Sequence, residues 1–297
     1  MSSFRIALWQ LHIAVFLAGF TAILGRVIDM EESSIVWYRL LLSALMLFFY
    51  LLFIKDSLKI SPRNILSCFG IGSLIGLHWL FFYASIKAGN ASIALVCFSA
   101  TGSFTAILEP VITRRKFNWR EILTGLFVLI GIGLIFQFDS RYRSAIILGL
   151  SAAFFSAIFP IYTKKVLNKV NVTVLSFYVL TGGLLFLTLF LPLYTGNIYF
   201  LDLPSVNNWI WLGLLALFCT VIAFQFSFQA LKKLSAFTIN LTFNLEPLYG
   251  MIMAFIFFKE HHELSFSFYI GTAILLLSVG IETYMIRRKE KVKTDHM

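Results

Sequence analysis

Polar residues lie within a long apolar stretch near the end of the chain. Residues 225–260 are mostly apolar, yet they include Asn240, Asn244 and Glu246, with Pro247 directly after. Carboxylate and amide groups are costly in hydrocarbon and are usually paired or functional there. Burial favours the neutral form of a carboxyl group, which makes Glu246 a candidate for proton exchange. Alternatively, Glu246 accepts hydrogen bonds at a helix break made by Pro247.

Other polar side chains recur at helical spacing. Residues four apart share a face of a helix, which groups Gln225 with Gln229 and Ser99 with Ser103. One hypothesis is a solute cavity with aromatic walls and a few oriented polar groups. The alternative, favoured for the serines alone, is hydrogen bonding that holds helices together. The candidate cavity residues are Arg39, His78, Trp79, Tyr83, Ser99, Ser103, Gln225, Gln229, Asn240, Asn244 and Glu246.

Arg39 lies inside an apolar run, and the sequence leaves three roles open for it. Its planar guanidinium could bind a solute carboxylate through two parallel hydrogen bonds. It could pair with Glu31 or Glu32 in the polar segment that precedes the run. Its long side chain could also reach the membrane surface. The motif around Arg39, described below, favours a structural or gating role.

Metal, cofactor and enzyme signatures are weak. Glu260, His261, His262 and Glu263 resemble a metal cluster, but they occupy a turn between predicted helices. The three cysteines fall within apolar runs without metal spacing, so we interpret them as packing residues. The chain has no G-x-x-x-x-G-K-[ST] loop, H-E-x-x-H pair or G-x-S-x-G elbow. We therefore expect no metal, no cofactor and no enzyme activity.

Apolar residues dominate all 297 positions. Hydrophobic residues make up 59% and charged residues 13%, whereas soluble domains average roughly 45–50% and 25%. A spanning helix needs about 20 mostly apolar residues. Such runs lie near 5–27, 34–54, 65–87, 91–112, 119–138, 144–164, 173–194, 207–230, 235–258 and 265–286. The predicted fold class is an all-α polytopic membrane protein with ten transmembrane helices.

Basic residues are concentrated in alternate loops. With a cytoplasmic N-terminus, 18 of the 24 Lys and Arg residues fall in inside segments, five in outside loops, and Arg39 within a span. This asymmetry follows the rule that cytoplasmic loops are rich in Lys and Arg. It accounts for the net charge of +10 without a nucleic-acid partner. We expect a multi-pass protein of a bacterial inner membrane, embedded in the lipid bilayer, with both termini cytoplasmic.

The two halves of the chain resemble each other. Residues 78–95 align without gaps with residues 223–240, and residues 35–44 align with residues 175–184. A five-helix unit has an odd number of spans, so the second copy must insert upside down. Inverted repeats of this kind place the solute site near the middle of the membrane. The expected units are residues 1–138, residues 144–286 and a basic tail at 287–297.

Short motifs make a family resemblance specific. They are WYRLLLSA at 37–44, ALKKLSA at 230–236, Glu246-Pro247, Glu260 and Gly271. Through them almost the whole chain resembles the drug/metabolite transporter superfamily, in the form built from two EamA domains. The resemblance implies ten helices in inverted repeats, alternating access to a central cavity, and export of amino acids or other small metabolites. The second half keeps the pattern better, because Thr101-Gly102 aligns with Glu246-Pro247 and Arg115 with Glu260.

The leading hypothesis is a secondary transporter of small organic metabolites, with possible proton coupling. The alternatives are a membrane-embedded enzyme acting on a lipid or isoprenoid substrate, and a receptor or assembly subunit. A continuous cavity lined by His78, Trp79, Gln225, Asn240 and Asn244 would favour transport, whereas amides paired with each other would not. Gly72 and Gly76 predict a close helix contact, either within a monomer or in a homodimer.

Overall fold

The structure is a computed structural model that describes residues 3–138, 140–199, 201–234, 236–243, 245–274, 276–277 and 280–281. Within these residues the chain forms helices and no strands. The first half contains α1 (Ser3–Val27), α2 (Glu32–Phe53), α3 (Pro62–Ala88), α4 (Ala91–Phe98), α5 (Thr101–Thr113) and α6 (Trp119–Phe138). The second half contains η1 (Ser140–Tyr142), α7 (Arg143–Leu167), α8 (Val172–Thr195), α9 (Val206–Ala216), η2 (Leu217–Ile222), α10 (Ala223–Leu231), α11 (Ala236–Phe243), α12 (Glu246–Phe258), η3 (Glu260–His262) and a helical segment at 266–274.

Polar residues at the ends of the apolar runs start several of these helices. The side chain of Asn90 accepts a hydrogen bond of 2.9 Å from the N–H of Ile93 and caps α4. Asn171 caps α8 in the same way through the N–H of Thr173. Side-chain oxygens at this position satisfy N–H groups that have no partner within the helix. The caps therefore fix where the helices begin.

Seven helices, or pairs of consecutive helices, in the described part of the chain are long and apolar enough to cross a membrane. This confirms a polytopic, all-helical membrane protein. The other three predicted spans also fall on helical residues, namely α6, the pair α11 and α12, and residues 266–274. The count of ten transmembrane helices stays a prediction.

Two predicted spans are each divided into two α-helices by a turn near their middle. The span at 91–112 consists of α4 and α5, and the span at 235–258 consists of α11 and α12. Each bound of the second pair lies 145 residues after its counterpart, because α4 begins at residue 91 and α11 at 236, and α5 ends at 113 and α12 at 258. The same offset relates the aligned residues 78–95 and 223–240. The two interruptions therefore occupy matching places in the aligned halves.

The break before α12 differs from the one that the sequence suggested. Pro247 is the second residue of α12 rather than an interruption within a helix. A proline is well tolerated at this position because its missing N–H would have no partner in the first turn. The break between α4 and α5 has no proline, and the hydroxyl of Thr101 donates a 2.6 Å hydrogen bond to the carbonyl of Phe98 there.

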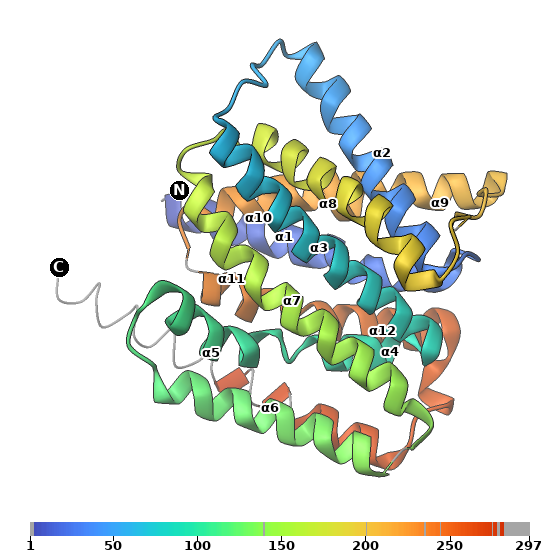
Figure 1. Cartoon of the computed structure of the whole chain (residues 1–297). Coiled ribbons are helices and arrows are strands. Elements are labelled where there is room, and N and C mark those ends of the chain that lie inside the picture. The colour runs from blue at the N-terminus through green and yellow to red at the C-terminus, as the bar shows by residue number, and fades with distance from the viewer. Residues whose placement is uncertain are drawn as a thin grey trace.

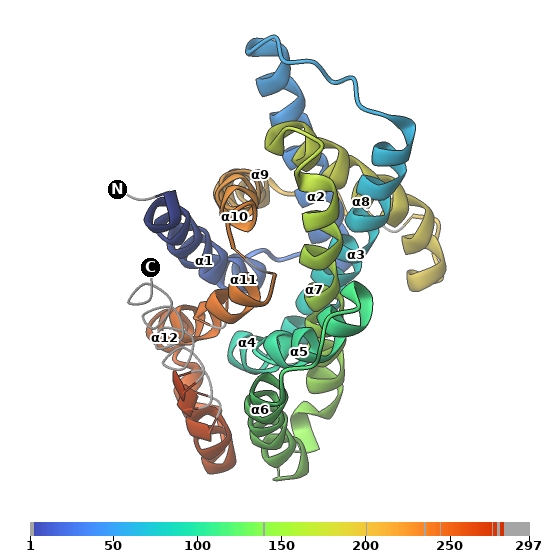
Figure 2. The same cartoon turned by 90° about the vertical axis from the view of Figure 1, so that its left-hand side faces the viewer.

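Glycines let α3 pack closely against the second half of the chain. α3 contacts α7 and α8, while α1 contacts α10 and α12 (Figures 1 and 2). A Cβ atom on Gly72 would overlap the carbonyl oxygen of Val179 and lie 2.5 Å from the backbone nitrogen of Gly183 in α8. Gly72 therefore makes its close helix contact within the chain, and it provides no evidence for a dimer.

The connections between helices gather at two ends of the bundle. The loops at 54–61, 114–118 and 168–171 lie toward the left in Figure 1, and those at 28–31 and 89–90 lie toward the right. The first group carries the basic residues that the charge pattern assigned to the cytoplasm. We call these the basic end and the opposite end.

Candidate functional site

A cavity of about 70 Å³ lies between the two halves of the chain. A cavity needs roughly 10–15 Å³ to hold one water molecule, so this one has room for several waters or a very small solute. Its polar lining residues are Thr21, Arg39, His78, Ser156, Ser227 and Glu246. Its aromatic lining residues are Trp79, Phe82, Phe98, Phe159, Phe224, Phe228 and Phe243.

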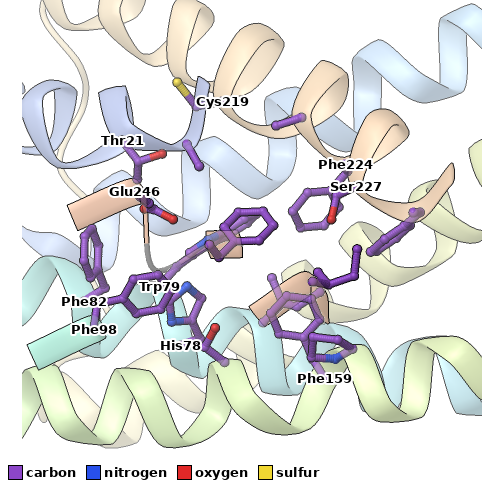
Figure 3. Close-up of a pocket in the computed structure, with 18 of the residues that line it drawn as sticks. Thr21, His78, Trp79, Phe82, Phe98, Phe159, Cys219, Phe224, Ser227 and Glu246 are labelled. Atoms are coloured by element: carbon purple, nitrogen blue, oxygen red, sulfur yellow. The ribbon is translucent and has the colours of Figure 1, made fainter. Parts of the chain in front are cut away.

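The cavity extends from the middle of the bundle toward the basic end. Its lining includes Leu231, the last residue of α10, and Ile239 in the following helix α11. In Figure 3, Trp79 and His78 lie between Glu246 on one side and Phe224 on the other. Helices from both halves of the chain therefore contribute side chains to one cavity.

Arg39 is the most deeply buried cation of the site. It is only 2% exposed, and it lines the cavity from α2. Its Nε donates to the Thr220 hydroxyl at 2.8 Å, its Nη1 to the Tyr83 hydroxyl at 3.0 Å, and its Nη2 to the Cys219 carbonyl at 2.9 Å. The guanidinium carbon lies 3.7 Å from the centre of the Trp79 ring. The side chain turns inward instead of reaching the membrane surface.

Two of the Arg39 partners lie in a short π-helical segment. η2 interrupts the span made of α9 and α10, and it carries Cys219 and Thr220. Segments of π-helix are rare and occur frequently at functional sites. The Thr220 hydroxyl donates to the carbonyl of Leu215 at 3.1 Å, so its oxygen is left to accept from Arg39. Sequence reasoning did not find Thr220 or Cys219, because no residue type marks a π-helix.

Glu246 faces the same cavity from the start of α12. The side chain is 5% exposed and belongs to the first turn of the helix. The first turn of a helix favours a negative charge. Among the described residues, the ion pairs do not include Glu246 or Arg39. The cavity thus contains a cation and a carboxyl group that do not pair directly.

His78 contributes a polar group in an aromatic setting. Its Nδ1 lies 3.1 Å from the carbonyl oxygen of Ala152 in α7. A carbonyl only accepts, so Nδ1 carries the proton in this bond and Nε2 is the acceptor of the neutral ring. The ring stacks on Phe98 with centroids 5.1 Å apart. This packing fixes the orientation of the ring in the cavity wall.

Several sequence-predicted residues lie outside the cavity lining. Ser103 donates to the backbone carbonyl of Gly125 in α6, which is a hydrogen bond between helices, whereas Ser99 donates to the carbonyl of Val96 in its own turn. Gln229 accepts a 2.6 Å hydrogen bond from Gln10, and Gln225 accepts one of 3.2 Å from Thr173. Tyr83 does not line the cavity and is connected to it through the hydrogen bond that it accepts from Arg39. The Asn240 side chain and all of Asn244 lie outside the described residues, so the cavity roles of these two amides stay predictions.

Glu260 forms a buried polar cluster at the opposite end of the bundle. Its side chain is fully buried and pairs with Arg26 at the end of α1. It also accepts hydrogen bonds from the N–H of Ala91 at 3.2 Å and from both the N–H and the hydroxyl of Ser92 at the start of α4. We call these four residues the Glu260 latch. The latch ties both halves of the chain together.

The counterpart of Glu260 behaves differently at the basic end. Arg115 pairs with Glu109 at 3.3 Å and with Glu121 at 2.9 Å, both within the first half. Lys164 of α7 donates to the carbonyl of Leu234, beside the cavity end. The two ends therefore carry different polar contacts.

The acidic and histidine residues after α12 do not converge on one point. Glu260 is occupied by the latch, and the rings of His261 and His262 pack at a tilt with centroids 4.0 Å apart. In the described part of the chain, no group of three His, Cys, Asp or Glu side chains is placed to hold a metal ion.

The sequence matches a transporter family and several proteins that are named as uncharacterized transporters. The model of the EamA-like transporter family matches residues 5–137 and again residues 143–283. The chain is 24% identical to the uncharacterized transporter YetK of Bacillus subtilis, over 65% of this chain and 59% of YetK. It is 24% identical to the uncharacterized transporter YyaM of the same organism, over 83% of this chain and 86% of YyaM.

Other matches span less of the relatives or show the fold alone. An uncharacterized transporter of Haemophilus influenzae is 25% identical over 48% of this chain and 49% of its own length. The chain thus spans about half to three fifths of YetK and this relative. One crystal structure superposes with a TM-score of 0.67 over 97% of this chain and 99% of the other, at 15% identity.

Proposed function

We propose that this chain, which belongs to the EamA-like transporter family, is a secondary transporter that moves a small organic metabolite out of the cell. The family and the matched relatives are transporters, so the membrane-embedded enzyme considered above is not favoured. The observation that carries the proposal is the cavity between the two halves. It combines aromatic walls with Arg39 and Glu246, which face it without pairing to each other.

The chemistry of the cavity supports a solute with both charged and apolar parts. The Arg39 guanidinium is suited to a carboxylate, and the Glu246 carboxyl group is suited to an amine. Aromatic side chains offer apolar contact and can also attract a cation through their ring faces. An amino acid carries all of these features. At about 70 Å³ the cavity is smaller than the 300–1,000 Å³ of typical ligand pockets. A larger solute would require the walls to move.

Alternating access between two inverted repeats is the proposed mechanism. The matching breaks in α4–α5 and α11–α12, and the two successive family matches, support the repeat. Broken helices around a site at the repeat interface are common in such transporters. The Glu260 latch would close the outer face, and the cavity would exchange solute at the basic, cytoplasmic end. This orientation rests on the distribution of Lys and Arg.

Glu246 is the proposed coupling group. A carboxyl group in a cavity of low polarity can bind a proton when the charged form is not matched by solute. Proton binding and solute binding would then alternate at one site. Glu109 is unsuited to this role because Arg115 pairs with it at the end of the bundle.

The substrate can be found by comparing extracellular metabolites of cells that express the protein with those of cells that lack it. The metabolite that accumulates outside would then be measured in proteoliposomes. Trp79→Ala should slow its flux and weaken its binding, because Trp79 lines the cavity and stacks on Arg39. The substitution Trp9→Ala, at an exposed residue of α1, is the matched control. Equal losses of binding and of thermal stability in Trp79→Ala would make Trp79 a packing residue.

A further inference from the structure

We propose that η2 and Tyr83 form a clamp that presents the Arg39 guanidinium to a carboxylate group of the transported solute. This inference rests on the proposed function and deepens it. It assigns Thr220 as a positioning residue, which acts on the solute only through Arg39.

The first observation is that neutral groups hold the Arg39 side chain. Its three hydrogen-bond partners are two hydroxyl groups and a backbone carbonyl. A buried charge is normally compensated by an opposite charge because it has lost its hydration. Among the described carboxylates, none forms an ion pair with Arg39. The clamp therefore satisfies N–H groups through neutral acceptors. Glu246 lines the same cavity without forming an ion pair with Arg39, so the guanidinium can still pair with an anion that enters.

The second observation is that the π-helix leaves Arg39 a backbone acceptor that an α-helix would use itself. In an α-helix the N–H of Ala223 would donate to the carbonyl of Cys219, four residues earlier. Here it donates to Phe218 and Thr220 instead, and the Cys219 carbonyl accepts from Arg39. The Thr220 hydroxyl uses its hydrogen on Leu215, which turns its oxygen toward Arg39. The irregular backbone and the arginine thus fit each other.

The third observation concerns the orientation of the guanidinium plane. Trp79 covers one face at 3.7 Å, and three hydrogen bonds fix the rotation of the plane. A guanidinium has five N–H groups, so these bonds leave two of them. A planar fork of N–H groups matches the two oxygens of a carboxylate. Because the fork is already ordered, less conformational entropy is lost when an anion binds.

The test uses protection of a native cysteine and needs no knowledge of the physiological solute. Cys219 lines the cavity, whereas Cys68 and Cys97 do not. In a Cys68→Ser, Cys97→Ser protein, one would measure the rate at which methyl methanethiosulfonate modifies Cys219. The probes are acetate and its neutral amide, acetamide, which are small, share a shape and differ in charge.

The clamp predicts that the acid slows modification of Cys219 and that the amide does so weakly. In Thr220→Val, the half-protecting concentration of the acid should rise about tenfold, as expected when an arginine loses one charge-assisted bond. The half-protecting concentration of the amide should not change. Thr220→Ser keeps the hydroxyl and should restore protection. Tyr83→Phe is the second test variant if Thr220→Val fails to fold.

Thr163→Val is the matched control, since Thr163 is also buried and its hydroxyl donates to Phe159 within α7. Equal protection by acid and amide, protection by neither, or equal shifts in Thr220→Val and Thr163→Val would overturn the clamp. Flux together with equal protection by acid and amide would contradict the clamp and leave the proposed transport intact. Acid-specific protection in a protein that shows no flux would support the clamp and contradict the proposed transport.

Discussion

Replacing Glu260 by Gln should open the cavity toward the end of the bundle that carries this residue. Glu260 is fully buried and belongs to the second half of the chain, whereas Arg26, Ala91 and Ser92 belong to the first. Opening this face requires the two halves to separate here. If the proposed alternation takes place, the latch should therefore stabilise the conformation that is closed at this end.

The size of the effect follows from the contacts of Glu260 that lose their negatively charged partner. A glutamine keeps the shape and can still accept hydrogen bonds, but it removes the ion pair with Arg26 and the charge assistance from Ser92. Hydrogen bonds to charged groups contribute about 1.5–3 kcal/mol. Because each 1.4 kcal/mol changes an equilibrium constant tenfold, the population of the open conformation should rise roughly 10- to 100-fold. Arg26 is partly exposed and can regain water, which limits the penalty for the variant.

The assay is the labelling of Cys219 by a membrane-impermeant thiol reagent applied to the face that carries Glu260. The background protein has Cys68→Ser and Cys97→Ser. Glu263→Gln is the matched control, because Glu263 is exposed and lies 3.8 Å from the other Nη of Arg26. We expect faster labelling in Glu260→Gln only. An unchanged labelling rate in a folded Glu260→Gln protein, or equal acceleration in Glu263→Gln, would refute the latch.

Two further predictions concern coupling and packing. Glu246→Gln should abolish the pH dependence of flux in proteoliposomes, since an amide cannot exchange a proton. The control Glu109→Gln should retain the pH dependence. A pH profile of Glu246→Gln like that of the wild type would exclude Glu246 as the coupling group. Gly72→Leu should lower the melting temperature measured by size-exclusion chromatography after heating, because its side chain would overlap α8, at a cost of about 1–3 kcal/mol or more. Gly70→Leu, which meets open space, should have little effect, and equal melting temperatures for the two variants would contradict the packing argument.

Much of the architecture could be predicted because it depends on local composition. Long apolar runs identified the helices, and the alignment of residues 78–95 with 223–240 anticipated the equal offset of the broken helices. The break between α4 and α5 was not predicted, since no proline marks it and residues 91–112 are uniformly apolar. Hydrophobicity measures whether a segment can enter the membrane and does not report a change in backbone hydrogen bonding.

The candidate site was predicted in part for a related reason. Arg39, His78, Trp79 and Glu246 were identified because polar or aromatic groups in a membrane span are conspicuous. Their partners depend on tertiary contacts across long sequence separations, such as the 181 residues between Arg39 and Thr220. Periodicity placed Gln225 and Gln229 on one face of a helix but could not show that this face meets Gln10 and Thr173 rather than the cavity.

The central claim is that the cavity lined by Arg39 and Glu246 is the path of the solute. Its most direct test is to attach a bulky maleimide to Cys219 and then measure flux of the metabolite found outside expressing cells. After modification, the Cys68→Ser, Cys97→Ser protein should lose flux to the level of empty liposomes. The same protein with Cys219→Ser added should keep its flux, because it has no cysteine left to react. Undiminished flux through fully modified protein would contradict the account.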